Sequence, residues 1–298
     1  MSGGVGLEIA AADYNNIRNK VISILGTGAT IRGYGQSIVS TAVLTGDIIT
    51  KGQWDALRYD ISSIKLHQTG VMPSMTVVQT ILPIGYSLGN ANSSYDTIAD
   101  QAILDKFNVA TSQSVISAAA SRTLSTVWHV QAQSTLTVTF STANEARYFF
   151  NSGGKIRFTT SRSGGTSTSQ NNAWTALLTA AGTILFGSDT PVLVNFYNLT
   201  NAYQTFYQRS SSASYILNYY SLEVMSNVAN NVYGTATVLT FRITLHDPHA
   251  ALGGSPTDYA DGNLLIAVEE LKAVGNLVPT GPFSITSPIY SLSTITAS

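Results

Sequence analysis

Tyr14-Asn-Asn-Ile-Arg-Asn-Lys-Val-Ile-Ser-Ile24 and Trp54-Asp-Ala-Leu-Arg-Tyr-Asp-Ile-Ser-Ser-Ile64 carry the same apolar pattern, 40 residues apart. In each stretch the apolar residues follow at intervals of three, four and three positions, which places them along one stripe of a helix. A stripe this narrow is more typical of a coiled-coil seam than of a broad globular face. The sequence therefore predicts two similar helices that pair with each other or with a neighbouring subunit.

Signals for helix ends flank both stretches. Thr50 is suited to be the N-cap of the second helix, and Gly26 and Gly70 stand just past the two predicted ends. Arginine also recurs at the same place, as Arg18 and Arg58. We therefore assign residues 1–70 to a helical arm with a 40-residue internal repeat.

The composition favours a protein that works in an assembly. Charged residues make up 10% of the 298 residues, against about a quarter in typical globular proteins. The apolar content of 44% is ordinary, so Ser, Thr, Asn and Gln must supply the polar surface. Surfaces poor in Lys and Glu are typical of extensive subunit contacts, although secreted β-proteins share this tendency.

Several classes of protein are disfavoured. The net charge is −1 without a basic run, so we expect no nucleic-acid partner and no attraction to an anionic membrane. The absence of cysteine excludes disulfides, thiolate catalysis and Cys-ligated zinc. Residues 1–12 lack the features of a signal peptide, and no apolar run reaches the roughly 18 residues of a membrane span. We expect synthesis in the cytoplasm and no insertion into a membrane.

Beyond the arm, residues 71–122 read as a mixed connecting segment. It contains a predicted strand at Met75–Leu82 and a predicted helix at Thr97–Phe107. Residues 123–298 then read as a β-rich body with a C-terminal tail. Period-two alternation predicts strands, with these apolar faces: Leu136, Val138, Phe140; Ile156, Phe158; Tyr220, Leu222, Val224; Leu239, Phe241, Ile243, Leu245.

Three further features complete the predicted body. Trp174, Leu177, Leu178, Ala181 and Leu185 are at helical spacing, with Gly187 placed to end that helix. Ser161–Asn172 reads as an exposed loop before it. Ser284–Ser298 would be disordered on its own or would add a strand to a neighbour. The predicted fold class is α+β: a pair of similar N-terminal helices followed by a mostly antiparallel β body with an inserted helix.

Five segments together resemble a known family of proteins. They are Ile9-Ala-Ala-Ala-Asp-Tyr-Asn-Asn-Ile-Arg18, Ile49-Thr-Lys-Gly-Gln-Trp-Asp-Ala-Leu-Arg58, Leu66-His-Gln-Thr-Gly70, Asn144-Glu-Ala-Arg-Tyr-Phe-Phe-Asn-Ser-Gly-Gly-Lys-Ile-Arg-Phe158 and Asp258-Tyr-Ala-Asp-Gly-Asn-Leu264. The set resembles virion structural proteins of tailed bacteriophages, notably those that infect marine cyanobacteria. This resemblance implies a structural role in the tail, neck, baseplate or head surface, and it implies no catalytic residues.

The strongest enzymatic motif is Gly85-Tyr-Ser-Leu-Gly89, which matches G-x-S-x-G. A nucleophile elbow needs a helix directly after the serine, and the residues after Ser87 begin no helix. We interpret the motif as a turn after a strand. Gly26-Thr-Gly-Ala-Thr-Ile-Arg-Gly33 resembles a phosphate-binding loop, but it follows a helix and lacks Gly-Lys-Ser/Thr, so capping and turning are its expected duties.

Histidines offer one local cluster, His246-Asp-Pro-His249. Two histidines and a carboxylate can bind zinc or iron if they converge. Pro248 and the alternation of the strand favour instead a polar strand end that leads into a loop. His67 and His129 are isolated in the sequence and suit a helix end and a strand face.

Several aromatic residues could form a surface on which a sugar stacks, or they could pack in the core or between subunits. The candidates are Tyr148-Phe-Phe150, Tyr203, Phe206, Tyr207 and Tyr219-Tyr220. Neighbouring residues on a strand point to opposite faces, so each pair must divide between core and surface. Core or subunit packing explains these residues more economically.

The expected function is therefore that of a structural component of a tailed-phage virion, most consistent with a tail, neck or baseplate position. Its expected partners are copies of itself and other virion proteins, with no cofactor, no metal and no catalytic residue. The alternatives are a receptor- or glycan-binding fibre or capsid decoration module and, with little support, a hydrolase of cell-surface material. The hydrolase would require two acids that meet in a cleft, and none of the 16 acids lies in such a motif.

Overall fold

A computed structural model describes residues 11–28, 30–75, 95–188, 194–212, 215–248, 259–278 and 281–298. The predicted α+β class is confirmed, with N-terminal helices followed by a mostly antiparallel β body. Contacts between residues divide the chain into two compact units. Unit 1 comprises Met1–Val115, Arg147–Gly154 and Lys272–Thr286, and unit 2 comprises Ile116–Ala146, Lys155–Leu271 and Ser287–Ser298.

Unit 1 is built on α1 (Ala11–Leu25), α2 (Lys51–Thr69) and α3 (Tyr95–Leu104). The two predicted seams are fully buried, each residue at most 2% exposed: Tyr14, Ile17, Val21, Ile24, Trp54, Leu57, Ile61 and Ile64. The seams meet within the chain, where the Tyr14 and Trp54 rings pack edge to face with centroids 5.3 Å apart. The third helix closes the cluster through the ring of Tyr95, 5.2 Å from that of Trp54.

The predicted helix ends are also confirmed. The Thr50 hydroxyl accepts a hydrogen bond from the Gln53 backbone N–H, and the Gln53 side chain accepts one from the Thr50 backbone N–H. Gly70 ends α2 in the left-handed region with a φ of 76°, which glycine adopts without strain. Gly26 follows α1, and its N–H donates to the carbonyl oxygen of Ile22.

A segment without helix or strand, residues 36–44, crosses α1 and α2 and is called here the crossing segment. The buried Asp60 carboxylate of α2 accepts hydrogen bonds from the backbone N–H groups of Val39 and Ser40, both at 2.9 Å. The Gln36 amide donates to the Ser284 carbonyl oxygen and accepts from the Ser284 N–H. Unit 1 therefore joins residues that are 248 positions apart in the sequence.

The remaining elements of unit 1 are short. They are the 3-10 helix η1 (Thr111–Gln113) and the paired strands β9 (Asn276–Leu277) and β10 (Gly281–Pro282). The Ser63 hydroxyl of α2 bonds both the N–H and the carbonyl oxygen of Val278, which fixes this strand pair on α2.

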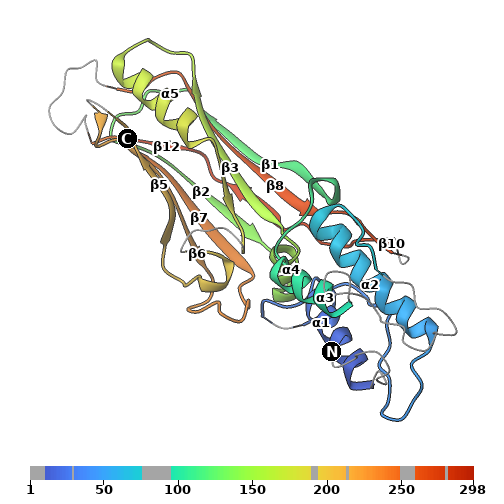
Figure 1. Ribbon diagram of the computed structural model, residues 1–298. Coiled ribbons are helices and arrows are strands. Elements are labelled where there is room, and N and C mark those ends of the chain that lie inside the picture. The colour runs from blue at the N-terminus through green and yellow to red at the C-terminus, as the bar shows by residue number, and fades with distance from the viewer. Residues whose placement is uncertain are drawn as a thin grey trace. The chain divides into compact units, whose positions relative to one another are not determined.

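Unit 2 is a β-sandwich (Figure 1). One sheet has the order β1 (Ser114–Leu124), β8 (Asn263–Ala273), β3 (Lys155–Ser163), β4 (Thr183–Phe186). The other has the order β11 (Ile289–Leu292), β2 (Gln131–Thr139), β7 (Val238–His246), β6 (Tyr219–Ser226), β5 (Gln204–Ser210). Helix α5 (Ser169–Ala181) and the 3-10 helix η2 (Phe196–Asn198) lie in the connections between strands. Helix α4 (Ala143–Asn151) connects β2 to β3, and its residues from Arg147 onward belong to unit 1.

Four buried phenylalanines join the two sheets. Phe158 and Phe186 come from the β3–β4 side, and Phe206 and Phe241 come from the β5–β7 side. The Phe241 ring centroid lies 5.1 Å from that of Phe158 and 5.1 Å from that of Phe186. Offset and edge-to-face aromatic pairs add to the free energy gained from burying their area, so this cluster is the centre of the sandwich core.

The predicted strands of the body are confirmed. Strand β7 pairs with both β2 and β6 in antiparallel register, with Phe241 opposite Leu136 and Val224. The inner faces of β2 and β7 are buried as the alternation predicted. The predicted helix at Thr97–Phe107 corresponds to α3, which begins two residues earlier and ends at Leu104. The strand predicted at Met75–Leu82 lies, beyond Met75, outside the described residues.

Two boundaries were predicted wrongly. Helix α5 ends at Gly182 rather than Gly187, and Leu185 belongs to β4. Gly182 has a φ of 62° and stops the helix one turn before the apolar spacing runs out. Ser161–Asn172 is not an exposed loop throughout, because its ends belong to β3 and α5 and Asn171 is fully buried.

The C-terminal tail adds its strands within the chain. Strand β11 and the short strand β12 (Thr296–Ala297) both pair antiparallel with β2. Both strands of the tail therefore lie along the same edge of the sheet. Leu292 and Ile295 are buried. The expectation that this tail is disordered on its own or extends a neighbour's sheet is therefore corrected: Ser287–Ser298 is part of the sandwich of unit 2, and residues 284–286 belong to unit 1.

No helix in the described part of the chain is both long and apolar enough to cross a membrane.

Leu57→Ala should lower the free energy of unfolding of unit 1. Leu57 is 0% exposed at the seam of α2, and truncation of a buried leucine costs about 2–5 kcal/mol. Chemical denaturation monitored by circular dichroism measures the loss. Leu104→Ala is the matched control, because that leucine is 77% exposed and its truncation should cost about 0.5 kcal/mol or less. Equal effects of the two changes would refute the role assigned to the seam.

Candidate functional site

The histidine cluster His246-Asp-Pro-His249 is described only as far as Pro248. His246 ends β7 with its ring 4.8 Å from that of Tyr219. The next residue, Asp247, is fully buried and accepts hydrogen bonds from Gln170 and from the indole N–H of Trp174, both on α5. His249 lies outside the described residues. Among those that are described, no group of three or more His, Cys, Asp or Glu residues is arranged to bind a metal.

The two isolated histidines have different surroundings. His129 is exposed beside Tyr259. His67, near the end of α2, is buried, and its Nε2 lies 3.0 Å from the Ser152 carbonyl oxygen. Its ring stacks on Phe283 at a centroid distance of 4.6 Å and an angle of 5°. Burial lowers the pKa of His67 to about 4, against a weaker opposite effect of the Ser152 carbonyl, so His67 is a neutral core residue at pH 7.

The glycine-rich stretch after α1 makes turns, as its position after a helix suggested. The N–H of Gly33 donates to the Ser23 carbonyl oxygen at 2.8 Å, and that of Gly35 donates to the Gly26 carbonyl oxygen at 2.9 Å. The Asn151 amide donates to three carbonyl oxygens of this stretch, those of Thr30, Arg32 and Gly33. The N–H groups of Gly33 and Gly35 are therefore already used within the chain and are not available to bind a phosphate. The other motif, Gly85–Gly89 with Ser87, lies outside the described residues.

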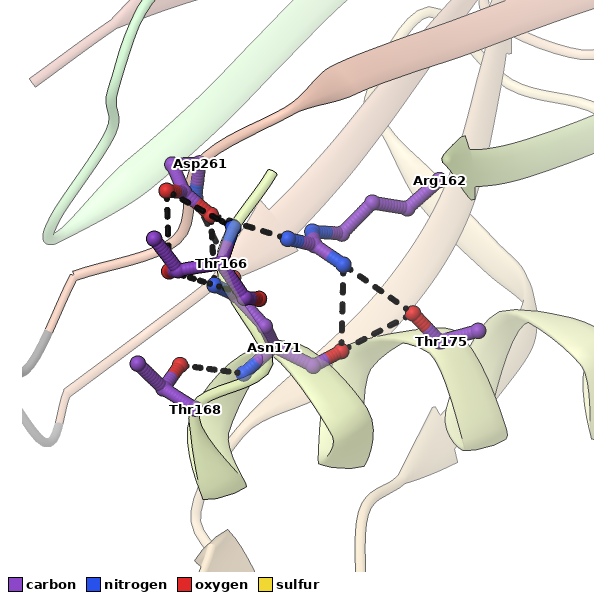
Figure 2. Close-up of polar contacts among 6 residues, drawn as sticks. All are labelled: Arg162, Thr166, Thr168, Asn171, Thr175 and Asp261. Atoms are coloured by element: carbon purple, nitrogen blue, oxygen red, sulfur yellow. Dashed lines mark hydrogen bonds and ion pairs between the residues drawn. The ribbon is translucent and has the colours of Figure 1, made fainter. Parts of the chain in front are cut away.

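A polar network fixes the loop between β3 and α5 (Figure 2). The Asp261 carboxylate accepts hydrogen bonds from the guanidinium of Arg162 at 3.0 Å and from the backbone N–H and hydroxyl of Thr166. Asn171 donates to the same carboxylate at 2.5 Å, and its own amide oxygen accepts from the Asp261 N–H. Arg162 also donates to the Thr175 hydroxyl of α5.

This network is structural in character. Burial by itself raises the pKa of Asp261, but the hydrogen bonds from Thr166, Asn171 and Arg162 outweigh it and hold the pKa below its ordinary value. Gly262 fits closely here, since a Cβ on it would lie 2.6 Å from the Ser163 carbonyl oxygen. The carboxylate is saturated with donors, so it is ill suited to accept a proton from a substrate. Asp261 lies in one of the segments that carry the family resemblance, yet the sequence alone assigned it no role.

The aromatic candidates divide between core and surface. The expected division between core and surface fails for Tyr148-Phe-Phe150, because this stretch lies on the helix α4, where Phe149 and Phe150 are both buried. Tyr219 and Tyr220 point to opposite faces of β6 as predicted, with Tyr220 buried. Phe206 and Tyr207 do not divide, because a β-bulge between Thr205 and Tyr207 shifts the register.

One candidate binding surface is the outer face of the β2–β7–β6–β5 sheet. It holds a shallow groove of about 310 Å³. Its lining is almost entirely polar and includes Gln131, Gln133, Gln208, Tyr219, Glu223 and Arg242. The Arg242 Nε lies 2.6 Å from a Glu223 carboxylate oxygen, and its guanidinium lies 4.2 Å from the ring centroid of Tyr203. The groove thus offers amides, hydroxyls, an ion pair and the ring of Tyr219 without an excess of charge.

Comparison with protein-family models, with curated proteins and with solved structures finds no match.

The buried His67 predicts that stability falls with acidification. As the pH decreases below about 6.5, the unfolded chain binds a proton at this residue, whereas the folded chain does not until about pH 4. The free energy of unfolding should therefore decrease across this window, by about 3 kcal/mol over its full width. Urea denaturation at a series of pH values measures the slope. His67→Gln should flatten it, and His129→Gln, at an exposed position, should leave it unchanged. An unaltered slope in His67→Gln would contradict the assignment.

Proposed function

We propose that the protein is a structural component of a tailed-phage virion, acts through assembly interfaces rather than catalysis, and associates with copies of itself and with other virion proteins. Tail, neck or baseplate is the proposed location. Three observations support the proposal: the resemblance of five segments to such proteins, the low content of charged residues, and an exposed edge strand of the sandwich.

That strand, β1, is the observation that carries the proposal. It lies at the edge of its sheet next to β8, and all 11 of its residues are exposed or half-buried. Natural edge strands are usually protected by charges, prolines or a short length. Strand β1 is long, contains no proline and has Arg122 as its one charged residue. Val115 and Ile116 are 41% and 48% exposed. Such a strand is suited to pairing with another chain.

Light scattering on the purified full-length protein tests the assembly role. We expect a mass well above the monomer value of 31.6 kDa at micromolar concentration. Ala118→Lys, on an exposed position of β1, should shift the mass toward the monomer, because a lysine in a strand pairing must be desolvated. Ala202→Lys makes the same change at an exposed position outside the strands and is the control. A monomeric protein, insensitive to both changes, would contradict the proposal.

The outer-face groove favours a second candidate function, the binding of a host glycan. Amide and hydroxyl groups match the hydroxyls of a neutral sugar, and a tyrosine ring can stack on its apolar face while its own hydroxyl stays hydrated. Tyr219 is the ring that lines the groove, and the Arg242–Glu223 pair supplies a donor and an acceptor side by side.

A glycan array with the full-length protein tests this second candidate. Tyr219→Ala should remove most of the binding, because it deletes the ring that lines the groove. Tyr233→Ala is the matched control at a 66% exposed tyrosine outside the groove. If no glycan is retained, or if both variants bind equally well, the groove has no such role.

A further inference from the structure

A loop between α1 and α2 carries apolar side chains that are exposed to solvent. Residues 44–48 are called here the tip loop. They form a turn, in which the Asp47 N–H donates to the Leu44 carbonyl oxygen at 3.1 Å and Gly46 has a φ of 93°. Leu44 is 72% exposed and Ile48 is 86% exposed. Two large aliphatic side chains on one turn form an apolar projection, and exposed apolar groups gathered in this way mark interaction sites.

The tip loop is fixed at both ends. Val43, directly before it, is buried, and the Asn15 amide of α1 bonds both its N–H, at 3.1 Å, and its carbonyl oxygen, at 2.7 Å. Thr50, two residues after the loop, is the N-cap of α2 and is bonded to Gln53. The loop therefore holds its side chains in place before any contact, so a partner does not have to order it.

Unit 1 also contains a groove that suits such a projection. The groove lies against α1, has a volume of about 650 Å³ and is called here the α1 groove. Its lining includes Ile22 on α1, and Ile31 and Arg32 on the glycine-rich stretch that follows. The Asn151 amide donates to the Arg32 carbonyl oxygen at 3.1 Å, which fixes this wall as well. The groove thus offers branched aliphatic side chains to an apolar partner.

The tip loop does not fill the α1 groove of its own chain. Leu44 and Ile48 are both largely exposed. Asn15, which anchors the loop, and Ile22, which lines the groove, are seven residues apart on α1, and this spacing corresponds to about 10 Å along the helix axis. The loop and the groove are therefore separate surfaces, and the groove of one copy is open to the loop of another.

Charges on the two surfaces are complementary. Arg32 is exposed in the groove, and Lys106 lies near it: burial, and then repulsion by Arg32, lower the Lys106 pKa. The ion pairs of the described residues leave both cations without a carboxylate. On the tip loop, Asp47 is exposed and has no cation in that same set, while the next lysine, Lys51, pairs with Asp55. The groove thus lacks an anion, and the loop presents one.

We propose that the tip loop of one copy docks in the α1 groove of a second copy, with its two aliphatic side chains inside the groove and Asp47 beside Arg32. This inference rests on the proposed association of the protein with copies of itself and names a contact that β1 does not make. Because the loop and the groove are different surfaces, each copy can give its loop to one neighbour and receive the loop of another. A contact of this type can continue from copy to copy around a ring or along a filament.

Charge reversal with restoration by mixing tests the contact. Asp47→Arg and Arg32→Asp each bring like charges together, so each should weaken self-association of the full-length protein about tenfold or more. Mixed in equal amounts, the two variants should regain the mass of the unchanged protein, because every contact between unlike copies again joins opposite charges. Sedimentation velocity measures the mass. Arg209→Asp, at an exposed arginine on β5, is the control and should have no effect.

Disulfide trapping tests the same contact by distance. The chain has no cysteine, so one introduced cysteine per copy gives an unambiguous link. A protein with Ile48→Cys and a size-tagged protein with Ile31→Cys, mixed and mildly oxidised, should form a disulfide-linked mixed dimer. Val71→Cys is 67% exposed outside the tip loop, and in place of Ile48→Cys it should give little mixed dimer.

The outcomes separate this contact from assembly through β1. If mixing does not restore the mass, or if Val71→Cys links as readily as Ile48→Cys, the groove takes another occupant and the proposal is overturned. If the mass responds to Ala118→Lys and not to Asp47→Arg, assembly through β1 stands and this contact fails. If the mass responds to Asp47→Arg and not to Ala118→Lys, and the mixed dimer forms, this contact stands and β1 does not carry assembly. A monomeric protein that forms no mixed dimer overturns both.

Discussion

The structure depends on how the backbone of its irregular segments is satisfied. Buried N–H and carbonyl groups must be paired, and in this chain side-chain amides pair many of them. Asn15 and Gln36 each bond both the N–H and the carbonyl oxygen of one distant residue. In unit 2, the Asn231 amide likewise pairs two backbone groups, which here belong to two residues. It donates to the Phe196 carbonyl oxygen at 2.6 Å and accepts from the Ala236 N–H at 2.7 Å. Neutral amides suit a chain with few charges, because they can be buried at a lower desolvation cost than ions.

The sequence predicted the elements whose signal is local and periodic. The two seams and the alternating strands were found because their apolar residues repeat with the period of the element that buries them. Helix α4 was missed because Tyr148-Phe-Phe150 is a continuous apolar run, which carries no period. The end of α5 was misplaced because Leu185 fits the helical spacing by chance, while Gly182 stops the helix before it.

The candidate surfaces were less predictable, for a different reason. The division of Tyr219 and Tyr220 followed from alternation, but the bulge that keeps Phe206 and Tyr207 on one face depends on pairing with another strand. The network around Asp261 joins it to Arg162, 99 positions away. Most of the hydrogen bonds in this network are made by side-chain amides, hydroxyls or main-chain atoms. Such groups occur throughout the sequence, so the sequence does not indicate which of them bonds to Asp261. Long-range polar pairing of this kind leaves almost no pattern in a single chain.

The division into two units has a consequence for how the chain is made. Unit 1 needs Lys272–Thr286 and unit 2 needs Ser287–Ser298, so neither can be finished while those residues are still inside the ribosome. The seam helices and the first strands emerge early and must wait, with apolar stripes uncovered, for a closing segment that is translated more than 200 residues after α1. Contacts of such long sequence separation slow folding. The nascent chain is therefore expected to depend on chaperones until residues 272–298 have left the ribosome and can complete both units.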